Sequence, residues 1–240
     1  MEAILILHGW GIGSKTWIQV KRKLEERGYE VFVPDLPGFG ENPPPPKPWA
    51  INDYFEWVKD FCEKQNLSQF FLIGHSFGGG LAIKFVNFFP EKVKGLILVA
   101  PKIRRQKSYR YYLGLILSKL GKIVFSIPIF SFFQPLARKV LYVLIGTRDY
   151  YKLELEKTIT MKETFKKVIG EELIYYLPSI KISTLIIWGE KDAITPIKDA
   201  HLINKTIKGS RLEIVKDGEH ALNLQMPEIL AQKILNFIKP

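Results

Sequence analysis

Short apolar runs alternate with longer amphipathic stretches along most of this chain, and the apolar run comes first in each unit. This order is typical of a parallel sheet wrapped by helices. The runs predicted as strands are Ala3 to Leu7, Glu30 to Val33, Gln69 to Ile73, Val93 to Val99, Thr184 to Trp188 and Arg211 to Val215. The stretches predicted as helices are Lys15 to Arg27, Asn52 to Gln65, Phe77 to Phe89, Pro196 to Thr206 and Ala221 to Ile238. The uninterrupted apolar run from Leu96 to Val99 indicates a central strand that is buried on both faces.

The alternation stops after Pro101 and resumes after Pro178, which predicts an insertion within one domain. We expect residues 1–101 and 179–240 to form the core and residues 102–178 to form a helical cap. Apolar residues recur at helical spacing from Tyr109 to Val124, and the stretch from Tyr150 to Leu177 also has a helical pattern. The proline-rich run from Pro43 to Pro48 predicts an extended, solvated connection.

The composition is that of an ordinary globular chain, with 240 residues of which 47% are hydrophobic and 25% charged. Disordered, collagen-like and disulfide-scaffold proteins are therefore excluded. The single cysteine, Cys62, cannot form an internal disulfide, so we expect a packed thiol in a reducing compartment. Neither a signal peptide nor a membrane-spanning run is recognisable: the longest charge-free apolar stretch, Ile123 to Ala137, is short and contains two prolines. These features predict a cytoplasmic location.

Most of the net charge of +11 belongs to one segment. Between Ala100 and Arg148 there is no Asp or Glu, but there are ten lysines and arginines, so the rest of the chain carries a net charge of only +1. A positive electrostatic field confined to one segment needs an explanation in that segment, such as an anionic partner or a solvated face. No nucleic-acid-binding motif accompanies the charge, so we expect no nucleic-acid partner.

The strongest local signal is the pentapeptide Gly74-His75-Ser76-Phe77-Gly78, which lies between a predicted strand and a predicted helix. In this context G-x-S-x-G is typical of a nucleophile elbow, a strained turn that exposes a serine hydroxyl above the sheet. Side chains in place of either glycine would collide across such a turn. The alternatives are a glycine-rich helix entrance without chemistry and a phosphate-binding turn, although the lysine of the phosphate-binding motif is absent.

A serine nucleophile needs a nearby base, which is in turn oriented by a carboxylate. Of the four histidines, His8 and His75 flank glycines at strand ends, and His201 lies inside a predicted helix. His220 follows the last strand, in a loop expected at the carboxyl edge of the sheet, and is our candidate for the base. The alternative is that His220 is an ordinary surface histidine.

The loop after the penultimate strand supplies Asp192 as the candidate acid. A carboxylate following the strand Val93 to Val99 would be an alternative, but the next acidic residue there is Asp149. Asp192 could also be a turn or helix-capping residue before Pro196. Glu190 is its nearest competitor, whereas Asp217 has the position of a turn former before a glycine.

The negative charge that develops in the transition state needs backbone donors. In a strand-turn-helix site, one amide comes from the residue after the nucleophile, here Phe77, and another from the loop after the first strand. That loop reads His8-Gly9-Trp10-Gly11, so Trp10 is the candidate second donor. The indole of Trp10 could instead be a rim aromatic, which is compatible with the same role of its amide.

Together, Ser76, Asp192 and His220 in this order, the H-G-W-G loop and the run Asp35 to Gly40 resemble the α/β-hydrolase superfamily over about residues 3–101 and 179–238. The resemblance implies an α/β-hydrolase fold with about six parallel strands, helices on both faces and a helical cap insertion. It also implies a nucleophile, acid and base at those three positions, with an oxyanion hole made by the amides of Trp10 and Phe77. Members of the superfamily commonly begin with antiparallel strands that are absent here, so the strand Glu30 to Val33 is expected at an exposed edge.

The leading functional hypothesis is a serine carboxylesterase that acts on a small-molecule ester through an acyl-enzyme. The basic cap and the H-G-W-G loop also resemble esterases that cleave the methyl ester of an acyl chain held on an acidic carrier protein. Other hypotheses are docking of the cap on an anionic membrane surface, and carbon-carbon bond hydrolysis or a lyase reaction by the same triad. No metal cluster or nucleotide fingerprint is apparent in the sequence, so no cofactor is expected.

Overall fold

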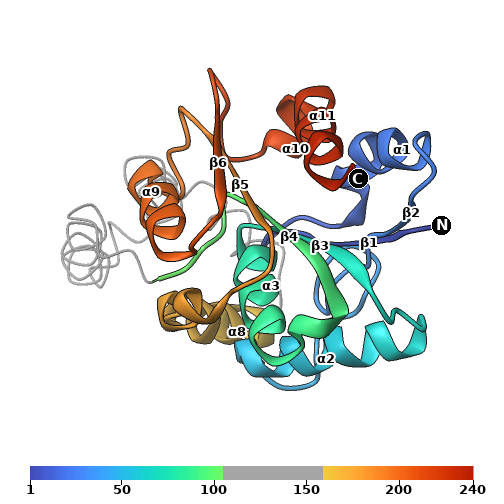
Figure 1. The fold of residues 1–240 in the computed structure, drawn as a ribbon. Coiled ribbons are helices and arrows are strands. Elements are labelled where there is room, and N and C mark those ends of the chain that lie inside the picture. The colour runs from blue at the N-terminus through green and yellow to red at the C-terminus, as the bar shows by residue number, and fades with distance from the viewer. Residues whose placement is uncertain (105–158, 240) are drawn as a thin grey trace, which may run out of the picture.

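A computed structural model describes residues 1–104 and 159–239, and the predicted strands form a single sheet within them. Every strand pairs with its neighbours in parallel, in the order β2-β1-β3-β4-β5-β6 (Figure 1). The strands are β1 (Ala3–Leu7), β2 (Glu30–Phe32), β3 (Phe70–His75), β4 (Val93–Val99), β5 (Thr184–Gly189) and β6 (Arg211–Val215). The prediction of a six-stranded parallel sheet is confirmed.

The predicted helices are also present, although two of them are divided. The helices of the core are α1 (Ile18–Glu25), α2 (Ile51–Lys64), α3 (Phe77–Phe88), α9 (Ile197–Thr206), α10 (Leu222–Gln225) and α11 (Pro227–Ile238). The predicted Lys15 to Arg27 helix begins as a 3-10 turn, η1 (Ser14–Trp17). The predicted Ala221 to Ile238 helix breaks before Pro227, because proline has no amide hydrogen to continue a helix but is well suited to start one.

Helices cover both faces of the sheet, as expected (Figure 1). Side chains alternate between the faces along each strand. In β1, Leu5 and Leu7 join the core beneath α2, α3 and α9, whereas Ile4 and Ile6 join the core beneath α1 and α11. All four are completely buried, which explains why a central parallel strand is an uninterrupted apolar run.

The edge strand was also placed correctly by the sequence, since β2 lies at one end of the sheet. It has only three residues, and a short edge strand presents few unpaired backbone groups to another chain. Cys62 is buried, and burial raises the pKa of its thiol to about 12, in keeping with a packed rather than a reactive cysteine.

Part of the predicted cap is described, and it packs on the core. This part comprises α8 (Ile159–Gly170) and η3 (Ile174–Ser179), and the Tyr109 to Val124 stripe lies outside the described residues. Thr164 Oγ1 accepts a hydrogen bond of 2.9 Å from the Trp49 amide, and Lys102 Nζ donates to carbonyls near the end of α8. The division into a core and a cap with the boundaries given above stays a prediction.

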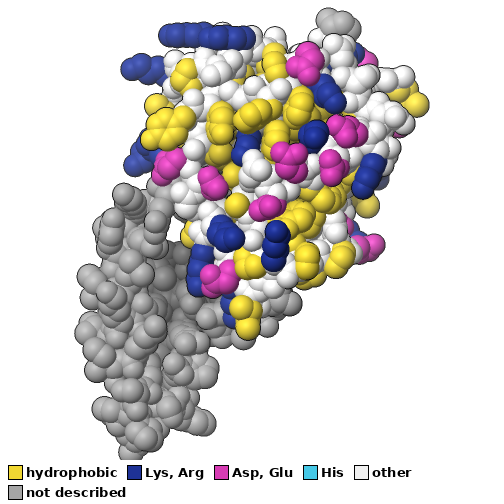
Figure 2. Space-filling model, turned by 90° about the horizontal axis from the view of Figure 1, so that it is seen from below, with side chains coloured by type: hydrophobic (Ala, Val, Ile, Leu, Met, Phe, Trp, Pro, Cys, Tyr) yellow, Lys and Arg dark blue, Asp and Glu magenta, His cyan; other side chains and the backbone are white. Residues whose placement is uncertain are grey.

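Charges of both signs alternate with apolar side chains on the face seen in Figure 2. Of the ten basic residues between positions 100 and 148, eight fall within residues 105–158, outside the described part. The other two, Lys102 and Arg104, make contacts within the fold: Arg104 forms an ion pair with the buried Asp199 of α9. Within residues 1–104 and 159–239, no helix combines the length and the apolar character needed to cross a bilayer.

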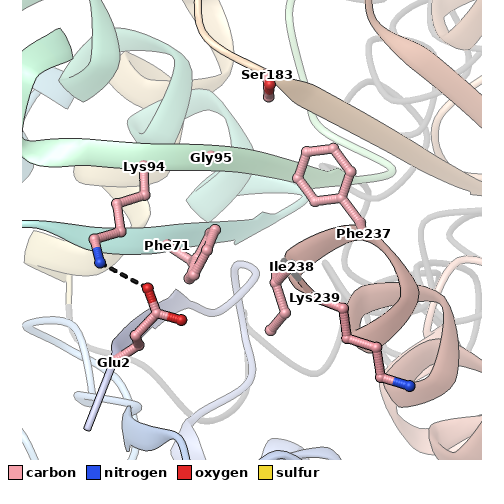
Figure 3. Close-up of a pocket in the computed structure, with 8 residues that line it drawn as sticks. All are labelled: Glu2, Phe71, Lys94, Gly95, Ser183, Phe237, Ile238 and Lys239. Atoms are coloured by element: carbon pink, nitrogen blue, oxygen red, sulfur yellow. Dashed lines mark hydrogen bonds and ion pairs between the residues drawn. The ribbon is translucent and has the colours of Figure 1, made fainter.

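The two ends of the sheet differ in what surrounds them. At the amino ends of the strands, an open hollow of about 260 Å³ is lined by apolar, charged and small residues (Figure 3). The lining residues are Glu2, Phe71, Lys94, Gly95, Ser183, Phe237, Ile238 and Lys239. The predicted site residues follow the carboxyl ends of the strands, at the opposite edge.

Candidate active site

Ser76 occupies a strained turn between β3 and α3. Its backbone has φ 51° and ψ −112°, a combination that residues with a side chain rarely adopt. The strain is held by hydrogen bonds on both sides of the residue: the Ser76 amide donates to the Val99 carbonyl at 3.0 Å, and the Ser76 carbonyl accepts from the Lys102 amide at 2.9 Å. These contacts tie the turn to the end of β4, as a nucleophile elbow requires.

The glycines around Ser76 permit backbone segments to approach very closely. A Cβ atom on Gly74 would lie 2.6 Å from the Gly78 carbonyl oxygen, and one on Gly78 would lie 2.1 Å from the Leu7 carbonyl oxygen. Both distances are far below van der Waals contact, so neither position accepts a side chain without movement of the backbone. The first turn of α3 therefore packs directly against the end of β1.

Asp192 and His220 meet in space, although 28 positions separate them in the chain. His220 Nδ1 lies 2.8 Å from Asp192 Oδ2, and a carboxylate only accepts hydrogen bonds, so Nδ1 carries the hydrogen. In a neutral ring this leaves Nε2 as the basic nitrogen. The Asp192 side chain is fully buried and that of His220 is 13% exposed. The pair is thus shielded from water on the side of the carboxylate.

Three further donors hold the Asp192 carboxylate in place. Oδ1 accepts from the amides of Ile194 at 2.8 Å and Thr195 at 2.9 Å, and Oδ2 accepts from the Thr195 hydroxyl at 2.8 Å. Burial by itself would raise the pKa of Asp192, but the hydrogen bonds from His220 and Thr195 outweigh it and hold the pKa below its ordinary value. Asp192 therefore both organises a turn and contacts His220.

The competing acids make other contacts. Glu190 Oε2 accepts from the Asp217 amide at 3.0 Å, and Asp217 forms a solvent-exposed ion pair with Lys191 at 2.6 Å. Asp217 has a positive φ of 58°, which fits its predicted place in a turn before Gly218.

Ser76 is one residue away from a contact with His220. The residue before it, His75, has its ring centre 4.9 Å from that of His220, and its Nε2 lies 3.0 Å from the His220 carbonyl oxygen. Both Ser76 and His220 are described, and no hydrogen bond joins the Ser76 hydroxyl to the His220 ring. In substrate-free active sites such bonds are often long and shorten only when substrate binds.

The loop after β1 runs beside Ser76. A Cβ atom on Gly9 would lie 3.3 Å from Ser76 Cβ and 2.9 Å from His75 Nδ1, so glycine is required for this approach. Phe77 is the first residue of α3, and the helix offers its amide no carbonyl partner. The Trp10 amide also makes no hydrogen bond to any described residue. Two free amides beside a serine at a helix N-terminus suit an anionic oxygen.

A buried histidine and a half-buried aspartate hold this loop in place. His8 Nε2 accepts from the Leu36 amide at 2.9 Å, and its Nδ1 lies 2.8 Å from the Gly9 carbonyl, which fixes one neutral tautomer. The Asp35 carboxylate accepts from the amides of Ser14 and Glu41. Burial opposes ionisation of Asp35, but these amide bonds prevail and lower its pKa.

An aromatic wall lies over the loop that follows β1. The Trp10 ring packs 4.8 Å from Phe39, 5.3 Å from Phe77 and 5.2 Å from Phe165 of α8, measured between ring centres. The described part of the predicted cap thus contributes directly to the surroundings of the candidate site. Among the described residues, no three His, Cys, Asp or Glu side chains are arranged to hold a metal ion.

Sequence reasoning gave no role to Thr195 and His75. The sequence signals were present: Thr195 follows Asp192 by three positions, and His75 stands inside the G-x-S-x-G motif. Their partners, however, are a carboxylate in a turn and a carbonyl 145 positions away, and such partners appear only when the loops are placed in space.

Comparison with known proteins identifies the type of fold. A family model described as "alpha/beta hydrolase fold" matches residues 2–121. A 2-hydroxy-6-oxononadienedioate/2-hydroxy-6-oxononatrienedioate hydrolase of Escherichia coli K12 is 25% identical over 99% of this chain and 87% of its own length. Monoacylglycerol lipase ABHD6 of Homo sapiens is 23% identical over 98% of this chain and 75% of its own. Among solved structures, an esterase from Exiguobacterium antarcticum superposes with a TM-score of 0.74 at 22% identity, over 100% of this chain and 92% of that protein.

Proposed function

The chain belongs to the alpha/beta hydrolase family, and from this premise we propose that it is a serine hydrolase that cleaves carboxylic esters. The observation that carries the proposal is the 2.8 Å hydrogen bond between His220 and the buried Asp192, next to a serine held in a strained turn. This arrangement provides a nucleophile, a base and an orienting carboxylate on three different loops at the carboxyl edge of one sheet.

In the proposed reaction, the Ser76 hydroxyl oxygen attacks the ester carbonyl carbon as its proton passes to His220 Nε2. The carbonyl oxygen becomes an oxyanion and accepts hydrogen bonds from the amides of Trp10 and Phe77. When the tetrahedral intermediate collapses, the bond to the alcohol oxygen breaks and His220 returns its proton to the departing alcohol. Water, deprotonated by His220, then attacks the acyl carbon, the bond to the Ser76 oxygen breaks to release the acid, and His220 returns the proton to Ser76.

Asp192 keeps its negative charge throughout this cycle. Its carboxylate holds the hydrogen on His220 Nδ1, so that Nε2 is free to accept the serine proton, and it stabilises the imidazolium that forms. The lowered pKa of Asp192 supports this role because the carboxylate stays ionised near neutral pH. The aromatic wall around Trp10 would contact an apolar part of the substrate.

The competing proposal is carbon-carbon bond hydrolysis by the same triad. It is supported by the likeness to the Escherichia coli hydrolase, whereas the human lipase and the bacterial esterase are named for ester substrates. A substrate panel separates the two proposals. We expect turnover of short-chain p-nitrophenyl esters. Activity only on diketones that are products of ring cleavage would favour carbon-carbon bond hydrolysis.

The test of the proposed function is labelling with a fluorophosphonate, followed by peptide mapping and ester kinetics. Label should appear on Ser76, and Ser76→Ala and His220→Ala should each lower kcat by about 10³-fold or more. The matched control is Ser183→Ala, at the amino edge of the sheet, which should keep full activity. Unchanged turnover by folded Ser76→Ala would end the proposal.

Docking of an acidic carrier protein or an anionic membrane surface stays a proposal for the basic insertion. Since Arg104 is paired with Asp199, its reversal would disturb the fold as well as any docking. Reversal of Arg105, Lys107 and Arg110 to Glu is the cleaner test. Hydrolysis of a carrier-bound ester should fall while that of small esters is spared, and equal loss on both would argue against docking.

A further inference from the structure

His75, the residue before the candidate nucleophile, is 2% exposed and has no part in the reaction described above. Its Nε2 lies 3.0 Å from the carbonyl oxygen of His220. We propose that His75 is a positioning residue, which donates this hydrogen bond to hold the backbone of the base in register with the nucleophile. The inference rests on the proposed function and adds to it a contact that holds the His220 backbone, whereas Asp192 contacts the His220 ring.

The direction of the hydrogen bond follows from the chemistry of its two atoms. A carbonyl oxygen only accepts, so His75 Nε2 carries the hydrogen and Nδ1 is bare in the neutral ring. His75 Nδ1 is buried and has no hydrogen-bond partner among the described residues. A second hydrogen on Nδ1 would therefore lack an acceptor among the described residues. The site therefore selects one neutral tautomer with a single donor.

Burial supports the same assignment. It lowers the pKa of His75 to about 3, with a further contribution from the nearby His220. The Trp17 ring packs edge-on at 6.0 Å between ring centres, which limits rotation of the imidazole. His75 is thus a fixed neutral donor near neutral pH.

The position of this bond explains what it can do for the reaction. The other hydrogen bonds of the loop after β6 lead toward the loop of the acid or stay local: the Lys191 amide donates to the Gly218 carbonyl, and the Glu219 amide donates to the Gln225 side chain. The bond from His75 leads instead to the end of β3, one residue from Ser76. It couples the base to the nucleophile, and a misplacement of about 1 Å between such groups can lower a rate by about 10²-fold.

Three substitutions of His75 test the role of the donor. Glutamine can place its side-chain amide nitrogen near the position of His Nε2, whereas asparagine is too short and leucine has no donor. We expect His75→Leu and His75→Asn to lower kcat for p-nitrophenyl acetate by about 10- to 100-fold with KM changed less than twofold. His75→Gln should stay within about fivefold of the wild-type kcat.

Thermal unfolding of each variant separates positioning from stability. If His75→Leu does not fold, the comparison of His75→Gln with His75→Asn decides, since both are polar and smaller than histidine. Equal kcat for Gln and Asn, or a His75→Leu enzyme within twofold of wild type, would overturn the inference. The proposed function has its own criterion, labelling of Ser76 and loss of activity in His220→Ala, so failure of either idea is recognised separately.

Discussion

The carboxyl and amino edges of the same six strands carry polar groups of very different kinds. At the carboxyl edge, a strained Ser76 lies near a fully buried carboxylate, that of Asp192, and two histidines. At the amino edge, Glu2 and Lys94 form an ion pair of 2.7 Å whose side chains are 44% and 33% exposed, beside the open hollow of Figure 3. The comparison teaches that the open hollow and the crowded polar groups lie at opposite edges, and the proposed chemistry belongs to the crowded edge.

The difference has a physical origin in the parallel sheet. All strands point the same way, so the helix that follows each strand starts near the carboxyl edge and presents free amides there. Loops meet above these amides, and glycines at 9, 74 and 78 allow backbones to come within contact distance. Buried polar groups at such an edge must satisfy one another, which fixes their geometry.

The largest expected effect comes from removing the charge of the buried acid. Asp192→Asn should lower kcat by about 10⁴-fold, because an amide can favour the wrong tautomer of His220 and cannot stabilise its protonated form. The matched control is Asp217→Asn in the neighbouring loop, where the exposed ion pair with Lys191 is lost but asparagine tolerates the positive φ. Ester kinetics with both purified variants measure the effect, and similar rates in the two would remove Asp192 from the mechanism.

The second prediction compares one glycine from each edge. Gly78→Ala should lower the free energy of unfolding by about 3 kcal/mol or more, since its Cβ would lie 2.1 Å from the Leu7 carbonyl oxygen. The gain in helix propensity, about 1 kcal/mol, is too small to compensate. At Gly95 a Cβ would meet the Phe71 and Phe237 rings at 3.2 Å, and the Phe237 ring borders the open hollow and can shift.

Gly95→Ala should therefore cost less than about 1 kcal/mol. Urea unfolding of both variants provides the measurement. Equal destabilisation would show that the two edges are packed alike, contrary to the comparison.

A third prediction concerns the pH dependence of stability. The pKa of His75 falls from 6.5 to about 3 on folding, so between these values the unfolded chain binds the proton and the folded chain does not. Stability is thus lost as the pH falls below about 6.5. The other titratable groups near His75 are His220, Asp192 and His8, and they are present in both wild type and His75→Gln.

From pH 7 to pH 5, wild type should lose about 2 kcal/mol more unfolding free energy than His75→Gln. Urea unfolding at the two pH values measures this difference. His201→Gln, on the exposed side of α9, is the control and should follow the wild-type curve. Parallel curves for wild type and His75→Gln would mean that His75 is not buried in a neutral form.

The sequence was sufficient to predict the strands of the sheet, because strands buried on both faces are nearly continuous apolar runs, as β1 and β4 illustrate. Helix boundaries were less predictable. Near Pro227 the proline signals a break, but the apolar pattern continues on both sides of it and indicates one helix. The approach of His220 to Asp192 was inferred because both follow strands of a parallel sheet, and the strand ends meet at one edge. Their catalytic roles stay predictions.

Other parts of the site could not be read from the sequence. The hydrogen bond of His75 is directed to a carbonyl, and every residue has one, so no residue type marks the partner. The contact between Phe165 and Trp10 depends on where α8, near the end of the insertion, packs on the core. In both cases the sequence identifies a suitable side chain, and only the path of the chain supplies its neighbour.

The smallest effect is expected at the amino edge, from breaking its ion pair. Glu2→Gln should change the free energy of unfolding by less than about 1 kcal/mol, because an ion pair open to water gains little over two hydrated charges. Ester hydrolysis should be unchanged, since the pair lies at the opposite end of the strands from Ser76. The same urea unfolding and kinetic measurements apply here. A loss of kcat beyond twofold would show that the amino edge influences the placement of β3 and β1. The buried strands would then transmit a change from either end, and the two edges would differ only in degree.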